Sequence, residues 1–158
     1  MSLQQSHSFL YTEYTSSKDL SSDDQSLLVQ AIAASKNAYA PYSNFQVGAA
    51  VLLDDGSTVV ANNQENIAYP SGMCAERVLL YHVGANYPQR KIVKLLVYGQ
   101  GDLVEPHTPI SPCGACRQVI TEFIHKQKSP FEILMTAQNG RTIQVENALD
   151  LLPFAFGV

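Results

Sequence analysis

The chain is poor in cysteine and charged residues and has no long hydrophobic run. Each of these features excludes a class of protein. Three cysteines in 158 residues are too few, and odd in number, for a disulfide framework. No apolar run approaches the ~20 residues that a membrane-spanning helix needs, and the longest, from Val47 to Leu53, has the length of a strand. The N-terminus also lacks the basic region and apolar stretch of a signal peptide. These absences predict a cytoplasmic protein without a membrane partner.

Basic residues are also scarce. Ten Lys and Arg face fourteen Asp and Glu, which gives a net charge of −4. Binding of polymeric nucleic acid needs clustered positive charge, so DNA or RNA is not expected as a partner. The length and the 46% hydrophobic content are typical of one globular domain. We expect a flexible, Ser- and Thr-rich N-terminal arm over residues 1–22 and a single catalytic domain over residues 23–158.

Hydrophobic periodicity and turn residues indicate an α/β fold. Five predicted strands interleave with helices, an order that favours a sheet with helices on both faces. The predicted elements, in order, are a helix from Ser21 or Ser22 that ends before Pro41, strands at Phe45–Leu53 and Ser57–Ala61, a helix from Cys74 to about Val83, a strand at Lys91–Tyr98, a helix from about Cys113 to Lys126, strands at Phe131–Ala137 and Arg141–Val145, and a short helix at Glu146–Leu152.

All three cysteines lie in two short motifs, each at the start of a predicted helix. The motifs are Cys-Ala-Glu-Arg at residues 74–77 and Pro-Cys-Gly-Ala-Cys at residues 112–116. Cys113 and Cys116 are three residues apart and share one face of a helical turn. A helix N-terminus favours thiolate over thiol, and thiolate is the form that binds zinc. If the two helices converge, Cys74, Cys113 and Cys116 form a set of three zinc ligands.

Three protein ligands are typical of a catalytic zinc site, because the fourth tetrahedral position stays open for water. Glu76 lies two residues from Cys74, so it can reach that position without binding the metal, which suits a proton shuttle. Three thiolates on a dication leave a net charge of −1. Arg77 and the two helix N-termini can offset that charge by donating to the sulfurs.

Other interpretations of these thiols remain open. A Cys-x-x-Cys pair is often a redox pair or part of a structural zinc site. A structural site needs a fourth ligand, and the four histidines are isolated along the chain, as expected of surface or core residues: His7, His82, His107 and His125. A redox pair does not account for a cysteine two positions before a glutamate. The combination Cys-x-Glu with Pro-Cys-x-x-Cys is the signature of zinc-dependent nucleobase deaminases.

The sequence resembles the cytidine deaminases that act on free nucleosides, in their three-cysteine, homotetrameric subfamily. The resemblance extends from Asn37 to Gly157 and is carried by blocks at residues 38–50, 63–66, 74–77 and 111–118, with a weaker one at residues 151–157. It implies a three-layer α/β/α sandwich with a mixed five-stranded sheet. It also implies one Zn²⁺ per subunit and a homotetramer in which neighbouring subunits complete each pocket.

The same resemblance implies roles for residues outside the zinc motifs. Asn63 and Glu65 would bind the ribose 3′-hydroxyl, a task that suits an amide beside a carboxylate. Phe45 would stack on the base. Without the resemblance, Asn63 would be expected to cap a strand end and Phe45 to lie in the core.

Three further roles rest on the resemblance alone. The backbone N–H of Ala75 would hold the base carbonyl, and the backbone carbonyl of Ser111 would meet the departing amine. Phe156 would insert into the site of a neighbouring subunit. For Arg77, the resemblance implies the charge-neutralising role argued above, against the alternative of an ordinary surface arginine.

The implied activity is hydrolytic deamination of cytidine and 2′-deoxycytidine to uridine and 2′-deoxyuridine plus ammonia, as in pyrimidine salvage. Two alternatives share the zinc motifs: deamination of another small cytosine compound such as blasticidin S, and a non-catalytic module with a structural zinc. Polynucleotide editing would need an open basic channel, which the acidic composition disfavours. The pair Asn63 and Glu65 favours a nucleoside, and a fourth protein ligand would favour the structural module.

Overall fold

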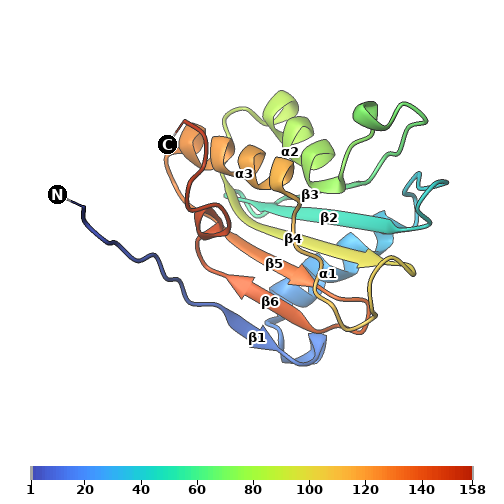
Figure 1. The fold of residues 1–158 in the computed structure, drawn as a ribbon. Helices are drawn as coiled ribbons and strands as arrows, with labels where there is room; N and C mark the ends of the chain where they lie inside the picture. Colours follow the sequence, from blue (N-terminus) through green and yellow to red (C-terminus); the bar gives the residue numbers. More distant parts are fainter. Residues whose placement is uncertain (1, 158) are drawn as a thin grey trace.

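A single mixed β-sheet lies between helices on both faces (Figure 1). The computed structural model describes residues 2–157. The sheet order is β1-β6-β5-β4-β2-β3; β4 and β5 are parallel and every other neighbouring pair is antiparallel. The strands are β1 (Thr12–Tyr14), β2 (Gln46–Leu53), β3 (Thr58–Asn62), β4 (Ile92–Gln100), β5 (Glu132–Thr136) and β6 (Thr142–Val145). The predicted α/β/α sandwich is confirmed.

The three helices divide between the two faces of the sheet. α1 (Ser22–Ser35) covers one face, while α2 (Ala75–Asn86) and α3 (Gly114–Gln127) cover the other (Figure 1). α1 begins where the sequence predicts, because the Ser21 side chain accepts a hydrogen bond from the backbone N–H of Asp24. The larger apolar core lies between the sheet, α2 and α3, and a smaller one lies under α1.

The sheet has six strands, so the expectation of five is corrected. The additional strand, β1, lies within the expected N-terminal arm and pairs antiparallel with β6. Tyr14 Oη donates to Gln144 Oε1 at 2.8 Å, and Arg141 forms a salt bridge with Glu13 at 2.7 Å. The division into an arm of residues 1–22 and a domain of residues 23–158 stays a prediction, and its end residues Met1 and Val158 lie outside the described residues.

Short helical turns complete the fold. The helix predicted at Glu146–Leu152 is a 3-10 helix at Ala148–Leu151, and two further 3-10 helices, at Ser17–Asp19 and Tyr69–Ser71, were not predicted. Over residues 2–157, no helix combines the length and hydrophobicity needed to cross a lipid bilayer.

The sheet topology brings three loops together at one end of the strands, beside the start of β2. β3 and β4 both pair antiparallel with β2, on opposite sides of it, so their last residues lie beside the start of β2. Asn62 pairs with Gly48, and Gln100 pairs with Gln46. The segment before β2, the loop from β3 to α2 and the loop from β4 to α3 therefore meet at this end of the strands, together with the N-termini of α2 and α3.

Candidate active site

The N-termini of α2 and α3 bring the three cysteines together. Cys74 is the N-cap residue of α2, Cys113 is the N-cap residue of α3, and Cys116 lies in the first turn of α3. The Sγ atoms of Cys74 and Cys113 are 3.8 Å apart, and those of Cys113 and Cys116 are 3.5 Å apart. All three sulfurs lie within 4.8 Å of one another.

This sulfur geometry fits a zinc ion. Zinc–sulfur bonds of ~2.3 Å in a tetrahedral arrangement place two ligand sulfurs about 3.8 Å apart. Within residues 2–157, no histidine or carboxylate joins the three sulfurs as a further candidate ligand. The cluster is therefore suited to a metal with three protein ligands and one position left for a small molecule.

The pKa values of Cys74 and Cys116 favour a bound cation. A hydrogen bond from Cys116 lowers the pKa of Cys74 to about 5, against the effect of burial and with the help of Arg77. The same hydrogen bond to Cys74, together with burial, raises the pKa of the Cys116 thiol. Negative charge on one sulfur thus disfavours it on the next, and a dication between them removes that conflict.

Arg77 lies beside the sulfurs. Its Nε atom is buried and has no hydrogen-bond partner among the described residues. A buried N–H without a partner is costly, but a thiolate that is held by a metal accepts such hydrogen bonds. The guanidinium charge already favours the Cys74 thiolate. Arg77 therefore lies within reach of the sulfurs, and its charge-neutralising role stays a prediction.

Glu76 is a buried carboxyl group beside the three thiols. It is only 4% exposed, and burial, followed by repulsion from the charge of Cys74, raises its pKa to about 7. It faces the same cavity as Cys74 and Cys113, although it does not belong to the group of candidate metal ligands. Glu76 can thus exchange protons with a molecule bound in the cavity without acting as a metal ligand itself.

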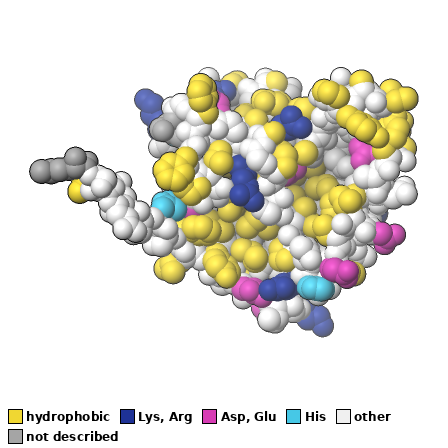
Figure 2. Space-filling model, viewed as in Figure 1, with side chains coloured by type: hydrophobic (Ala, Val, Ile, Leu, Met, Phe, Trp, Pro, Cys, Tyr) yellow, Lys and Arg dark blue, Asp and Glu magenta, His cyan; other side chains and the backbone are white. Residues whose placement is uncertain are grey.

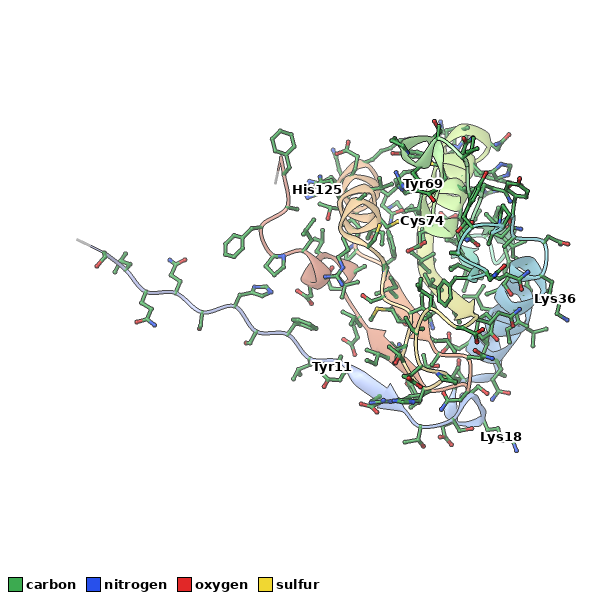
Figure 3. The ribbon with its side chains drawn as sticks, turned by 45° about the vertical axis from the view of Figure 1, so that its right-hand side comes forward. Tyr11, Lys18, Lys36, Tyr69, Cys74 and His125 are labelled. Atoms are coloured by element: carbon green, nitrogen blue, oxygen red, sulfur yellow. The ribbon has the colours of Figure 1, made fainter. Side chains whose placement is uncertain are left out.

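A cavity of about 490 Å³ extends from the sulfurs toward the start of β2. The structure brings most of the predicted site residues to its walls, namely Phe45, Asn63, Glu65, Cys74, Glu76, Arg77, Ser111 and Cys113. Ala75 and Cys116 are fully buried behind this wall, at the N-termini of α2 and α3. Figure 3 shows Tyr69, another wall residue, close to Cys74 beside α2.

Asn63 joins two parts of the cavity wall. Its Oδ1 accepts from the backbone N–H of Val47 at 2.8 Å, and its Nδ2 donates to the backbone carbonyl of Phe45 at 2.9 Å. One N–H of the amide stays available. Asn63 therefore fixes the backbone on both sides of Gln46, and it faces the cavity as a candidate ligand for a hydroxyl.

Glu65 lies at the outer part of the cavity and is held by its neighbours. The backbone N–H groups of Tyr42 and Ser43 donate to its Oε2 atom at 2.9 and 3.3 Å, and the Ser43 hydroxyl donates to Oε1. These hydrogen bonds, the one from the Ser43 hydroxyl above all, hold the pKa of Glu65 below its usual value. Phe45, which is 8% exposed, lines the same wall.

This geometry agrees with comparisons to known proteins. The family described as "cytidine and deoxycytidylate deaminase zinc-binding region" matches residues 21–130, which include the three cysteines and Glu76. The cytidine deaminase of Halalkalibacterium halodurans is 43% identical over 134 residues, which cover 85% of this chain and 94% of that protein. This chain belongs to the cytidine and deoxycytidylate deaminase family.

Other members of the family are similar in sequence and in structure. The cytidine deaminase of Mycobacterium tuberculosis is 35% identical over 79% of this chain and 83% of that protein. The crystal structure of the cytidine deaminase from Burkholderia pseudomallei superimposes with a TM-score of 0.72 at 40% identity, over 84% of this chain and 98% of that one. The fold and the zinc-binding region are thus those of the deaminase family.

In this family member, Phe156 does not line the cavity. Its side chain is 88% exposed. Gln118 holds its backbone, because the side-chain amide donates to the Phe156 carbonyl and accepts from the Phe156 N–H, both at 3.0 Å. The structure therefore does not bring Phe156 together with the other predicted site residues of this chain.

The structure adds several residues to the neighbourhood of the cavity that had no role assigned from the sequence. Arg117 donates to the carbonyls of Pro112 and Leu151 and, at 2.8 Å, to the Ser111 hydroxyl, so it fixes the segment before Cys113. The Ser43 hydroxyl contacts Glu65, and Leu103 also lines the cavity. Ser43 and Arg117 lie in two of the sequence blocks that resemble the deaminases, and that position was the only sign of a role in the sequence. Their contact partners depend on the fold.

Proposed function

We propose that this chain is a zinc-dependent deaminase that hydrolyses cytidine and 2′-deoxycytidine to uridine and 2′-deoxyuridine, with release of ammonia. The observation that carries the proposal is the meeting of three thiols and the buried Glu76 on one cavity at the N-termini of α2 and α3. The relatives named cytidine deaminase support the choice of substrate. A nucleoside of this size suits a cavity of about 490 Å³.

Cys74, Cys113 and Cys116 would hold one zinc ion per subunit. Zinc at this position supplies Lewis acidity, which lowers the pKa of a water molecule from about 15.7 toward about 7. The two helix N-termini and Arg77 stabilise the thiolates. A set of three ligands, with no fourth found in residues 2–157, supports the catalytic site over the structural zinc module.

Glu76 would move the protons of the reaction. Its carboxylate accepts a proton from water and passes it to N3 of the pyrimidine, which makes C4 electrophilic. The hydroxide that remains from this water would then add to C4. Glu76 would transfer the proton of the new C4 hydroxyl to the amino group, so that the C4–N bond breaks, ammonia leaves and C4 becomes a carbonyl. Water is consumed and ammonia is released, so the protons balance. The burial of Glu76 supports this role, because the cavity wall limits competing exchange with solvent.

Five groups would recognise the nucleoside. Asn63 and Glu65 would bind the 3′-hydroxyl, and Phe45 would stack on the base. The backbone N–H of Ala75 would hold the base carbonyl, and the backbone carbonyl of Ser111 would accept from the departing amine. The presence of Phe45, Asn63, Glu65 and Ser111 on the walls of one cavity supports this assignment.

We further propose that the protein is a homotetramer in which Phe156 completes the pocket of a neighbouring subunit. Phe154 and Phe156 are 95% and 88% exposed. On the face drawn in Figure 2, hydrophobic side chains gather around the middle of the surface. Exposed apolar surface of this kind is typical of protein interfaces. We also propose a cytoplasmic location and a place in pyrimidine salvage, the second of which is supported by the proposed nucleoside substrate.

A direct assay tests the proposed function. The purified, zinc-loaded protein is incubated with cytidine, 2′-deoxycytidine, cytosine, dCMP and blasticidin S, and the ultraviolet spectrum is followed for conversion of the cytosine ring to the uracil ring. We expect turnover of both nucleosides. Turnover of blasticidin S alone, or of none of these compounds, would contradict the proposal.

A further inference from the structure

Ser43 connects two residues of the proposed nucleoside site. Its hydroxyl donates a hydrogen bond to Glu65 Oε1, and the same oxygen accepts one from the backbone N–H of Phe45 at 3.0 Å. The only proton of the hydroxyl is thus directed at Glu65 while its oxygen is fixed by the main chain. All three residues belong to the segments that meet beside the start of β2, and both Ser43 and Glu65 line the cavity.

The carboxylate of Glu65 keeps room for a ligand. It accepts three hydrogen bonds, two of them on Oε2 from backbone N–H groups and one on Oε1 from Ser43. A carboxylate offers about four acceptor sites, so one site remains on Oε1. The Ser43 hydroxyl occupies the other site on Oε1 and, together with the two N–H groups on Oε2, fixes the direction of the remaining site. It also favours the ionised carboxylate, because it lowers the pKa of Glu65.

We propose that Ser43 is a positioning residue for sugar recognition: its hydroxyl orients the Glu65 carboxylate toward the 3′-hydroxyl of the nucleoside. The proposal rests on the proposed function and deepens it, since it assigns discrimination between sugars with and without a 3′-hydroxyl to the pair Ser43 and Glu65.

Removal of the Ser43 hydroxyl takes one hydrogen bond from the Glu65 carboxylate and one from the Phe45 N–H, but the loop has other supports that keep its backbone in place. Asn63 holds the backbone of Phe45 and Val47. The N–H of Asn44 donates to the carbonyl of Ala40 at 3.0 Å, and the N–H of Glu65 donates to the carbonyl of Tyr39 at 2.8 Å. Ser43 is exposed, so its replacement by Ala leaves no cavity in the core.

The test compares 2′-deoxycytidine with 2′,3′-dideoxycytidine, because these two nucleosides differ only in the 3′-hydroxyl. For each variant, kcat/KM is measured on both substrates, and the ratio of the two values reports recognition of that hydroxyl. We expect Ser43→Ala to lower the ratio about tenfold, because a hydrogen bond to a charged group is lost. Ser43→Thr retains a hydroxyl and should keep the ratio of the wild type.

The same substitution in a Glu65→Gln variant tests whether Ser43 acts through Glu65 or through the structure of the loop in general. In Glu65→Gln, the added change Ser43→Ala should alter the ratio less than about twofold, because the two residues act through one contact. An unchanged ratio in Ser43→Ala, or an equal loss with and without the Glu65 carboxylate, would overturn the proposal. Failure of the wild type to deaminate either nucleoside would instead overturn the proposed function, so the two failures are distinguishable.

Discussion

At the scale of single residues, the proposed chemistry depends on the buried carboxyl group of Glu76. Replacement by Gln keeps the shape of the side chain but removes its ability to carry a proton. We expect Glu76→Gln to retain zinc and to lose between roughly a hundredfold and ten-thousandfold of kcat on cytidine. Metal analysis and steady-state kinetics check both parts.

A matched control for that variant is Glu122→Gln on the exposed side of α3. It makes the same chemical change away from the cavity and should leave kcat unaltered. Comparable activity of Glu76→Gln and the wild type would rule out proton transfer by Glu76. Loss of zinc from Glu76→Gln would show that the residue supports the metal site instead.

The spacing of Cys74, Glu76, Cys113 and Cys116 was enough to predict the thiol cluster, because both motifs lie at helix starts. The sequence was less informative about Asn63. The structure shows that its amide also holds the Phe45 and Val47 backbone, which lie 18 and 16 residues away. Such contacts depend on the pairing of strands and are invisible to local patterns.

At the scale of elements, the close contact between α1 and β2 requires a glycine. A Cβ atom at Gly48 would lie 1.9 Å from the backbone carbonyl oxygen of Ala31. Because main-chain atoms cannot move aside as a side chain does, we expect Gly48→Ala to lower the free energy of unfolding by about 3 kcal/mol. Urea denaturation measures this change.

Gly114→Ala is the matched control, since a Cβ atom there would meet no heavy atom within 4 Å among the described residues, apart from its chain neighbours and the adjacent backbone of α3. It should not be destabilising. Equal stability of Gly48→Ala and the wild type would show that α1 and β2 are not packed as described.

A salt-bridge network connects α1 to the middle of the sheet. Lys94 Nζ lies 2.6 Å from Asp24 Oδ1 on α1 and 3.1 Å from Glu132 Oε2 on β5. Burial lowers the pKa of Lys94, but the hydrogen bonds to both carboxylates more than offset this effect and raise it above the ordinary 10.5. We expect Lys94→Met to lower the free energy of unfolding by about 2 kcal/mol near neutral pH, because the buried Asp24 carboxylate loses the positive charge that pairs with it.

The pH dependence of that difference has a definite sign. Because the folded-state pKa of Lys94 is raised, its contribution is complete below the ordinary pKa of 10.5 and is lost as the pH rises through the folded value. The stability gap between wild type and Lys94→Met should therefore shrink above about pH 10.5. The exposed Lys91→Met serves as the control. A gap that grows with pH would contradict the assigned network.

Most elements were predictable because their patterns are strong, whereas β1 was not. The strand has only three residues, and its burial does not alternate. It forms because the edge of β6 is available for pairing, so its existence depends on a strand 130 residues later in the chain. The 3-10 helix at Tyr69–Ser71 likewise carries no periodic signal.

At the scale of the whole molecule, the proposed assembly makes activity depend on concentration. If Phe156 completes a neighbouring pocket, dilution to monomers should lower specific activity, and Phe156→Ala should raise KM without loss of zinc. Val29→Ala, at an exposed apolar residue of α1 on the opposite face of the sheet, is the control. Sedimentation and kinetics at matched concentrations check this, and a fully active monomer would remove Phe156 from the site.

The proposed hydrolysis depends most on three sulfurs that bind one metal ion and leave one coordination position open. Zinc X-ray absorption spectroscopy on the loaded protein measures that geometry directly. We predict three sulfur neighbours at about 2.3 Å and one oxygen neighbour at about 2.0 Å. A shell of four protein ligands, or fewer than three sulfurs, would contradict the proposed catalytic site.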